Sequence, residues 1–374
     1  MDTKHNLRVL IAPLDWGFGH ATRCIPLIKA FSTCDCTVVI ACNGVAKRIL
    51  EPEFPHLLYL PLEGYNIRYS SSKQKFALTI LFQIPNIIKA IRREHRWLKK
   101  TVNEHNIDVV ISDNRYGFYH ITKPSVFITH QLLIQTPFRW LTTWIQKINY
   151  RFINRFKECW VPDFASEVNM AGDLSHPLKK PSVPVVYLGM LSRFLRKEGA
   201  KITYKWLFVL SGPEPQRTIL EDKLIKAVSS ITSAVLFVRG LPGSKDVLNL
   251  PENITVCNYL STAELNKAFA QSEYIVTRSG YTTVMEILAM QKKSILIPTP
   301  GQTEQEYLAR HLMKQQWCYV MQQNESIEPH LQQAELFDYS LPQLPSISVT
   351  ETISNFVSKI INKKILNSNS DNKL

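Results

Sequence analysis

Short apolar runs alternate with amphipathic helical segments along almost the whole chain, and this alternation most constrains the fold. The runs are continuous in valine, isoleucine and leucine, which indicates strands that are buried on both faces. Strands of this kind occur in parallel sheets covered by helices, so we predict an α/β protein. The predicted strands are Leu7–Pro13, Cys36–Ala41, Leu57–Pro61, Asp108–Ser112, Ser125–His130, Cys159–Pro162 and Pro184–Gly189, and then Trp206–Leu210, Ala234–Arg239, Ile254–Asn258, Tyr274–Thr277 and Ser294–Pro298.

A break in the alternation separates these two series of strands. Ser192–Lys205 is basic and has no clear period, so we expect a linker there. A length of 374 residues also exceeds what one hydrophobic core usually organises. The simplest architecture is two doubly wound, Rossmann-like domains facing a cleft, over residues 1–191 and 206–348. A helix over residues 349–366 and a polar tail over 367–374 follow. One option is that this helix packs back on the first domain.

The net charge limits the kinds of partner that the protein can have, and the cysteine content indicates its redox compartment. The formal net charge of +13 implies an anionic partner: a nucleic acid, a phospholipid surface or a phosphorylated substrate. Seven cysteines, with no C-x-x-C pair, indicate free thiols in a reducing compartment. The N-terminus has no signal-peptide pattern, and no apolar run reaches the ~18 residues that a membrane span needs. We expect a cytoplasmic protein, with peripheral binding at the inner face of the membrane as an option.

The first predicted strand runs into a glycine-rich loop, LDWGFGHATR, that feeds a helix N-terminus. Gly17 and Gly19 allow a tight turn and the close approach of a ligand, and a helix N-terminus attracts negative charge. We expect His20 and Arg23 to point into the cleft, with His20 as a general base because its reference pKa lies near neutrality. The alternative is a turn in which His20 only caps the helix. A dinucleotide fingerprint is disfavoured, because the third glycine is missing and no acidic residue ends the second strand.

The most specific stretch of the chain lies in the second domain, EYIVTRSGYTTVMEILAMQKKSILIPTPGQTEQEYLARHL. A predicted strand ends at Arg278, Ser279 and Gly280, and a helix begins at once. Free N–H groups at that N-terminus suit a phosphate or a pyrimidine carbonyl. Glu286 lies one turn into the helix, on the face that it shares with Thr282 and Thr283. A carboxylate in that place is suited to accept hydrogen bonds from two ribose hydroxyls.

A second polar cluster follows the next strand of this stretch. Pro298–Gly301 forces a turn, after which Gln302, Glu304 and Gln305 crowd the start of a helix. Amide and carboxylate side chains in this arrangement are suited to read sugar hydroxyls. The alternative is that they are ordinary solvated residues of a first helical turn.

Together these motifs resemble a known enzyme family. RSGYTTVMEILA followed by IPTPGQTEQEYLA is similar to the donor-site signature of glycosyltransferase family 28, and GFGHATR is similar to the N-terminal glycine-rich loop of that group. The family includes the transferase that adds N-acetylglucosamine to the lipid-linked peptidoglycan precursor. The resemblance implies the two-domain glycosyltransferase B fold. It covers most of the chain and is strongest over Gly17–Arg23 and Glu273–His311.

The resemblance also implies roles in the donor site. Glu286 would bind the donor ribose, Ser279 and Gly280 would line the diphosphate and uracil side, and Gln305 would contact the donor sugar. Glu306 stands where the peptidoglycan enzymes carry a second glutamine, so the resemblance does not identify the donor sugar.

The loop SGPEPQR, after the first strand of the second domain, occupies the place of the family's second glycine-rich loop. It holds a single glycine, and Arg217 at its end is a candidate for a charged contact to phosphate. The predicted donor-binding residues are Gly19, Gly212, Arg217, Arg278, Ser279, Gly280, Thr282, Glu286, Gln302, Glu304 and Gln305.

Polar residues also follow two strands of the first domain. Asp113 and Arg115 come at the end of one strand, and His130 and Gln131 at the end of the next. Ligands of open α/β sheets bind beyond the carboxyl ends of strands. We therefore expect Arg23, Arg115, His130 and Gln131 to bind an acceptor, and Asp113 to act as a second catalytic residue by orienting His20. The alternative is a structural hydrogen-bond cluster.

Two stretches of the first domain are amphipathic and basic. Ile87–Lys100 carries six basic residues against one acid, and Phe138–Lys157 carries five basic residues, no acid and several aromatic residues. Basic and aromatic residues together suit an anionic membrane interface. The alternative is a core helix with a solvated basic face. No nucleic-acid-binding module is recognisable, so we expect no nucleic acid partner.

These features predict an inverting transfer of a sugar from a UDP-sugar, for example UDP-N-acetylglucosamine, to a glycan, lipid-linked or small-molecule hydroxyl. Helix N-termini with Arg217 or Arg278 would stabilise the leaving diphosphate. No Asp-x-Asp sequence occurs, which disfavours the metal-dependent class, so we expect no metal and no other cofactor. Two alternatives stay open: a UDP-sugar epimerase of the same fold, and a non-catalytic basic protein that binds membranes or nucleic acid.

Overall fold

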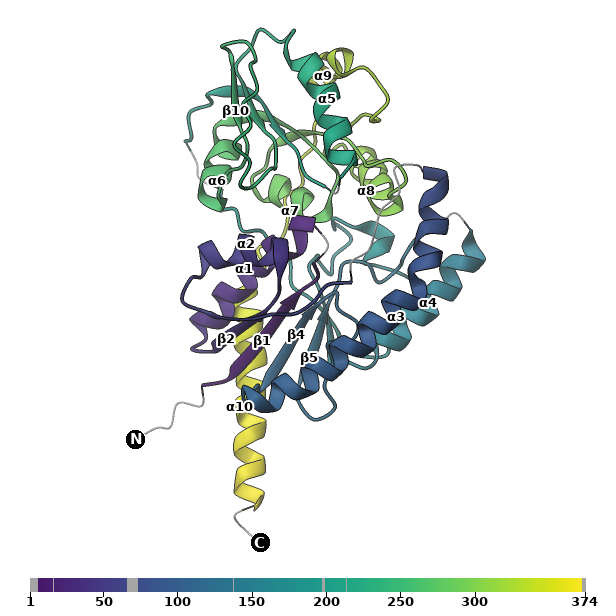
Figure 1. Cartoon of the computed structure of the whole chain (residues 1–374), viewed down its shortest axis with the longest axis vertical. Coiled ribbons are helices and arrows are strands. Elements are labelled where there is room, and N and C mark those ends of the chain that lie inside the picture. The colour runs from purple at the N-terminus through teal and green to yellow at the C-terminus, as the bar shows by residue number, and fades with distance from the viewer. Residues whose placement is uncertain are drawn as a thin grey trace.

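The protein forms two lobes, each built around one parallel sheet (Figure 1). The computed structural model describes residues 6–15, 17–65, 73–136, 138–196, 199–212 and 214–371. The side chains of residues 73–82 and 367–371 and of Arg139 lie outside the described part, as do Trp16 and Pro213 of the two predicted loops and residues 372–374 of the predicted tail. The predicted α/β class with two doubly wound domains is confirmed.

The first sheet has seven parallel strands in the order β3-β2-β1-β4-β5-β6-β7. Its strands are β1 (Arg8–Pro13), β2 (Thr37–Ala41), β3 (Leu58–Leu60), β4 (Val109–Asp113), β5 (Ser125–Ile128), β6 (Glu158–Val161) and β7 (Val185–Tyr187). Its helices are α1 (Gly17–Thr33), α2 (Gly44–Glu53), α3 (Lys73–Glu104) and α4 (Arg139–Ile153), with a 3-10 turn at Gly172–Leu174.

The second sheet has six parallel strands in the order β10-β9-β8-β11-β12-β13. Its strands are β8 (Tyr204–Val209), β9 (Val235–Val238), β10 (Ile254–Cys257), β11 (Ser272–Thr277), β12 (Lys293–Leu296) and β13 (Tyr319–Val320). The helices of this half are α5 (Gln216–Val228), α6 (Thr262–Ala270), α7 (Tyr281–Ala289), α8 (Thr303–Lys314) and α9 (Ile327–Leu336), followed by α10 (Val349–Asp371).

Strand β1 shows why the apolar runs are continuous. Val9 and Ile11 belong to the core cluster that includes the buried face of α1. Leu10 and Ala12 point to the other face and belong to a cluster with Leu98 of α3. Because successive side chains of a strand alternate between faces, a strand covered by helices on both sides needs apolar residues at every position.

Both sheets change direction at the same point in their strand order. In the first sheet the switch lies between β1 and β4, and in the second it lies between β8 and β11. Ligands of doubly wound sheets bind in the crevice beyond the carboxyl ends of the strands at such a point. The glycine-rich loop follows β1, and the Arg278–Gly280 segment follows β11, so both predicted motifs lie at switch points.

The C-terminal helix returns to the first domain. In Figure 1 the yellow α10 runs along the lower lobe, and Ile353, Phe356 and Val357 join the core cluster beside α1. The Phe356 ring meets the Trp160 ring edge-on, with the centroids 4.9 Å apart. The predicted end of this helix was too early, since the helix continues to Asp371.

Most predicted boundaries agree with the structure to within a few residues. The capping box that opens α6 is confirmed, with Ser261 and Glu264 hydrogen-bonding reciprocally. The linker Ser192–Lys205 was predicted slightly too long, because β8 begins at Tyr204. All seven cysteines lie in described residues and are free, as predicted.

Candidate active site

A cavity of about 470 Å³ lies between the two domains. The first domain contributes the start of α1 and the segment after β5, while the second contributes the start of α7, the start of α8 and the loop after β8. Sites of this size and polarity at a domain interface commonly bind small molecules. The predicted residues that line it are Gly19, His20, Arg23, His130, Gln131, Gly212, Gly280, Thr282, Glu286, Gln302, Glu304 and Gln305.

The carboxylate of Asp113 lies directly beneath this cavity. Asp113 is the last residue of β4 and pairs in register with Pro13 of β1, which places it beside the glycine-rich loop. Its side chain is fully buried. Burial opposes ionisation, but the neighbouring Arg23 guanidinium and His20 lower the pKa of Asp113 to about 2. The carboxylate is therefore ionised throughout the neutral range.

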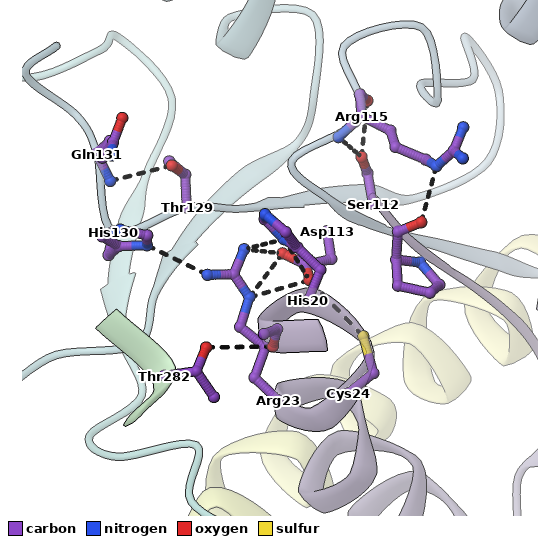
Figure 2. A network of polar contacts seen from close by, with 12 residues as sticks. His20, Arg23, Cys24, Ser112, Asp113, Arg115, Thr129, His130, Gln131 and Thr282 are labelled. Carbon is purple, nitrogen blue, oxygen red and sulfur yellow. Dashed lines mark hydrogen bonds and ion pairs between the residues drawn. The ribbon is translucent and has the colours of Figure 1, made fainter. Parts of the chain in front are cut away.

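His20 lies against this carboxylate, in the first turn of α1. Figure 2 shows its ring facing Asp113, and its Nδ1 atom lies 3.0 Å from Oδ2 of Asp113. Burial and the Arg23 charge lower the pKa of His20 below its usual value, although Asp113 opposes this. The ring is neutral near pH 7, and Nε2 has no hydrogen-bond partner within the described ranges of the chain. The ionised Asp113 carboxylate only accepts hydrogen bonds, so it favours the tautomer with the proton on Nδ1. In that tautomer Nε2 is a free acceptor on a residue that lines the cavity, and the neutral imidazole is suited to act as a general base.

Arg23 joins the residues beneath the cavity. Its Nε atom donates to both Asp113 oxygens at 2.9 Å, and a second nitrogen forms a further close contact with Oδ1. The same guanidinium lies 2.8 Å from Nδ1 of His20 and 3.2 Å from Nδ1 of His130. Since Arg23 is 2% exposed, its charge is neutralised locally by Asp113. The sequence predicted a contact with the acceptor for Arg23, and the structure shows it bonded inside this cluster.

Contacts between the domains close the back of the cavity. Nε2 of His130 lies 2.6 Å from Oε1 of Glu304, which belongs to the first turn of α8. The hydroxyl of Thr282 donates to the carbonyl of Gly19 at 3.1 Å. A Cβ atom at position 19 would lie only 2.9 Å from the Thr282 hydroxyl, so glycine permits this close approach of α1 to α7.

Glu286, in the cavity wall formed by α7, forms an ion pair with Arg193. Glu286 is 4% exposed, and its Oε1 accepts a hydrogen bond of 2.7 Å from Nε of Arg193. The same guanidinium donates to the hydroxyl of Thr262 at 3.1 Å. Burial raises the pKa of Glu286, while Arg193 opposes this. The predicted face of Thr282, Thr283 and Glu286 does line the cavity, but Arg193 already occupies one oxygen of the carboxylate.

The side-chain amides of Gln302 and Gln305 hold the turn before α8 in place. The backbone N–H of Thr299 donates to Oε1 of Gln305 at 2.9 Å, and Nε2 of Gln305 donates to Oε1 of Gln302 at 2.6 Å. The hydroxyl of Ser279 donates to the backbone carbonyl of Gln305 at 2.9 Å. Ser279 is fully buried and is not among the residues that line the cavity, so its hydroxyl, which was predicted to lie on the diphosphate side, points into the fold.

The two arginines predicted to hold the diphosphate are engaged elsewhere. Arg217 forms ion pairs with Glu214 at 2.5 Å and Glu221 at 3.0 Å. Arg278 donates to backbone carbonyls, including that of Gln216 at 2.8 Å, and burial lowers its pKa to about 10. Neither side chain lines the cavity. The prediction overlooked that buried guanidinium groups need partners within the fold.

Arg115 also departs from its predicted acceptor role. Its guanidinium donates to Oε1 of Glu94 at 2.5 Å and to the carbonyl of Pro13 at 2.9 Å. Figure 2 shows it turned away from His20, and it does not line the cavity. The second carboxylate oxygen of Glu94 accepts from Gly117 and Tyr65. Arg115 therefore belongs to a structural cluster, which is the alternative stated for this group.

Arg193 and Tyr281 are among the lining residues that the motifs missed. Arg193 lies in the linker, where the basic run gave no period to predict its direction. Tyr281 opens α7, stacks on His130 with centroids 3.9 Å apart and donates to the carbonyl of Pro162 at 2.6 Å. An aromatic residue at the start of a helix carries no signal for a contact across domains.

Two doubly wound domains with a cavity between their switch points define the class of protein, a two-domain glycosyltransferase B fold, which the solved structures below share. Residues 221–352 match the family model of the glycosyltransferase family 28 C-terminal domain, which confirms the predicted resemblance over that region. Solved structures agree on the fold. MurG from Acinetobacter baumannii superposes with a TM-score of 0.58 at 16% identity, over 95% of this chain and 99% of that one. The spinosyn rhamnosyltransferase SpnG complexed with thymidine diphosphate superposes with a TM-score of 0.60 at 14% identity, over 87% and 92% of the two chains.

Two curated proteins are similar to parts of the chain, and both carry the name UDP-N-acetylglucosamine–N-acetylmuramyl-(pentapeptide) pyrophosphoryl-undecaprenol N-acetylglucosamine transferase. The protein from Nocardia farcinica is 30% identical over 113 residues, which span 29% of this chain and 30% of that protein. The protein from Caldicellulosiruptor saccharolyticus is 31% identical over 80 residues, or 21% of each chain. The aligned segments thus span less than a third of these relatives.

Proposed function

We propose that the chain is a glycosyltransferase that moves a sugar from a nucleotide-sugar to an acceptor hydroxyl with inversion at the anomeric carbon. The observation that carries this proposal is the shared cavity. It places His20, backed by Asp113, opposite the α7 and α8 segments that resemble a family 28 donor site. The family model over residues 221–352 and the names of the relatives support the same chemistry.

In the catalytic step, His20 acts as the base that takes up the proton of the acceptor hydroxyl. Nε2 of His20 accepts the proton of the acceptor hydroxyl while the hydroxyl oxygen bonds to the anomeric carbon. The bond from that carbon to the diphosphate oxygen breaks, and the nucleoside diphosphate leaves on the opposite face. Asp113 is ionised beside Nδ1 and stabilises the imidazolium that forms.

The leaving group faces two helix N-termini. The starts of α1 and α7 both line the cavity, and Thr282 bonds to Gly19 where they meet. Free N–H groups at helix N-termini stabilise a developing negative charge. With Arg217 and Arg278 engaged elsewhere, we propose that these N-termini stabilise the diphosphate and that transfer needs no divalent metal.

We propose that Glu286 binds the ribose. Thermal stabilisation by a panel of nucleotides and nucleotide-sugars tests this on the wild type and on Glu286→Ala. A selective increase in melting temperature with UDP that the variant loses would support the donor site. The same increase in Glu286→Ala would refute the role of Glu286, and no increase with any nucleotide would refute the proposed function. Release of an altered sugar without an acceptor would instead favour the epimerase.

We also propose that the first domain binds an anionic membrane surface, which would bring a lipid-linked acceptor to the cavity. Phe138, Trp140 and Trp144 at the start of α4 are exposed, as is Ile88 on the basic α3. In Figure 1 both helices lie along one edge of the lower lobe. Exposed tryptophan beside lysine and arginine is typical of membrane-surface binding. Within the described residues, no helix is long and apolar enough to span a bilayer.

A further inference from the structure

His130 lies between a cation of the first domain and a carboxylate of the second. Its Nδ1 is 3.2 Å from a guanidinium nitrogen of Arg23, and its Nε2 is 2.6 Å from Oε1 of Glu304 (the Arg23 contact is drawn in Figure 2). A guanidinium only donates hydrogen bonds and, unlike Nδ1 of His20, Nδ1 of His130 meets no carboxylate among the described residues, so it accepts. Nε2 then carries the hydrogen and donates a hydrogen bond to Oε1 of Glu304. The two nitrogens of His130 therefore have fixed and opposite hydrogen-bonding roles.

The His130 ring is also held in orientation. It stacks on Tyr281 with the centroids 3.9 Å apart and the planes within 1° of parallel. The Tyr281 hydroxyl is anchored on the carbonyl of Pro162. Since His130 is 7% exposed, this packing aims Nε2 at Glu304. The direction of this hydrogen bond is built into the contact between the domains.

Glu304 has one oxygen free to face a ligand. Oε1 is bound by His130, whereas Oε2 has no hydrogen-bond partner in the part of the chain that the structure describes. The side chain lines the cavity and is one-third exposed. Burial opposes ionisation, but His130, together with His20 and Arg23, outweighs it and lowers the pKa of Glu304. A carboxylate in this state accepts hydrogen bonds only, which suits a ligand hydroxyl.

We propose that His130 is a positioning residue for the donor sugar. By holding Oε1 of Glu304, it aims Oε2 at a sugar hydroxyl and ties recognition of the sugar to the contact between the two domains. This inference rests on the proposed function, and it replaces the predicted contact of His130 with the acceptor. We assign the nucleotide part of the donor to Glu286 and the loop after β8, which line the same cavity.

Two substitutions separate this role from packing. In His130→Gln, the amide nitrogen lies the same number of bonds from the backbone as Nε2, so it is able to donate to Glu304. In His130→Asn, the side chain ends at the position of Nδ1 and does not reach Glu304. Both variants remove the imidazole ring that stacks on Tyr281, so a greater loss in His130→Asn than in His130→Gln points to the bond with Glu304.

Calorimetric titration of the full-length protein measures the affinity for the UDP-sugar or dTDP-sugar that binds the wild type most tightly, and for the free diphosphate of the same nucleoside. We expect all three proteins to bind the free diphosphate alike. The wild type and His130→Gln should bind the nucleotide-sugar more tightly than the diphosphate. His130→Asn should bind the nucleotide-sugar about tenfold more weakly than the wild type, because a charge-assisted hydrogen bond no longer orders Glu304.

Three results would overturn the inference and leave the proposed function standing. Equal losses in His130→Gln and His130→Asn would assign the effect to packing. A loss of affinity for the free diphosphate would show a general structural role. A wild type that binds the nucleotide-sugar no more tightly than the diphosphate would show that Glu304 does not read the sugar. A wild type that binds no nucleotide at all would instead refute the proposed function, and with it this inference.

Discussion

At the scale of single residues, the Arg23 guanidinium connects the proposed base with the proposed donor-sugar site. It contacts Asp113, His20 and His130, and His130 in turn contacts Glu304. A buried cation of this kind is stable only while its acid partner is ionised. The chemistry proposed for His20 therefore depends on Asp113 for its orientation and on Arg23 for the placement of both.

Replacing His20 tests the catalytic role directly. We expect His20→Ala to lower the rate of sugar transfer by about 10²–10⁴-fold, the usual contribution of a general base. The affinity for UDP should stay unchanged, because His20 is proposed to act on the acceptor hydroxyl. Transfer rates and calorimetric UDP binding measure the two effects. Loss of UDP binding together with activity would contradict this role.

The pH dependence of kcat/KM tests the environment of the same histidine. Burial and Arg23 lower the pKa of His20 below 6.5, and only the neutral ring accepts a proton. The acid limb of the profile should therefore lie below pH 6.5. Asp113 raises the pKa of His20, so Asp113→Asn should move the limb to still lower pH as well as slow the reaction. A limb that moves to higher pH in this variant would contradict the proposed pairing.

At the scale of elements, the segment after β6 helps to join the two domains. Asp163 is fully buried and accepts hydrogen bonds from the backbone N–H groups of Met170 and Ala171 and from the Ser175 hydroxyl. The segment that it shapes includes the backbone N–H of Asp173, which donates to the Tyr307 hydroxyl of α8 at 2.8 Å. The geometry of a loop between domains thus depends on one buried carboxylate.

We expect Asp163→Ala to destabilise the protein by about 3 kcal/mol, because several buried donors lose their acceptor at once. Denaturant unfolding measures this change in the free energy of unfolding. Asp338→Ala, which removes an exposed carboxylate, is the control and should change it by no more than about 0.5 kcal/mol. Equal effects of the two substitutions would show that Asp163 does not order this segment.

The elements themselves were largely predictable, whereas the partners of the polar side chains were not. Strands such as Val109–Asp113 follow from apolar runs, and α6 follows from its capping box. The two-residue strand β13 is too short to leave a pattern. Contacts such as Arg193 with Glu286 join residues far apart in the chain, and no local period encodes them. Arg217 and Arg278 were assigned from residue type alone, so their burial in the fold was missed.

At the scale of the whole molecule, the exposed surface of α3 and α4 predicts membrane binding. We expect the protein to sediment with vesicles of phosphatidylglycerol and phosphatidylcholine, and binding should weaken as salt screens the basic helices. Trp140→Ala combined with Trp144→Ala should reduce binding strongly. Val247→Ala combined with Leu336→Ala removes similarly exposed apolar side chains from the second domain and serves as the control. Equal binding by both double variants would rule out the proposed surface.

The cavity between the two domains unites the account, since neither domain holds both the proposed base and the proposed donor site. The most direct test follows the sugar itself. Wild type and His20→Ala are incubated in EDTA with extracted membrane lipids and the radiolabelled nucleotide-sugar selected by the thermal panel. The account predicts that label enters the lipid fraction with the wild type, with release of the nucleoside diphosphate, and not with His20→Ala. Equal transfer by both proteins, or no transfer by a wild type that binds the nucleotide-sugar, would contradict it.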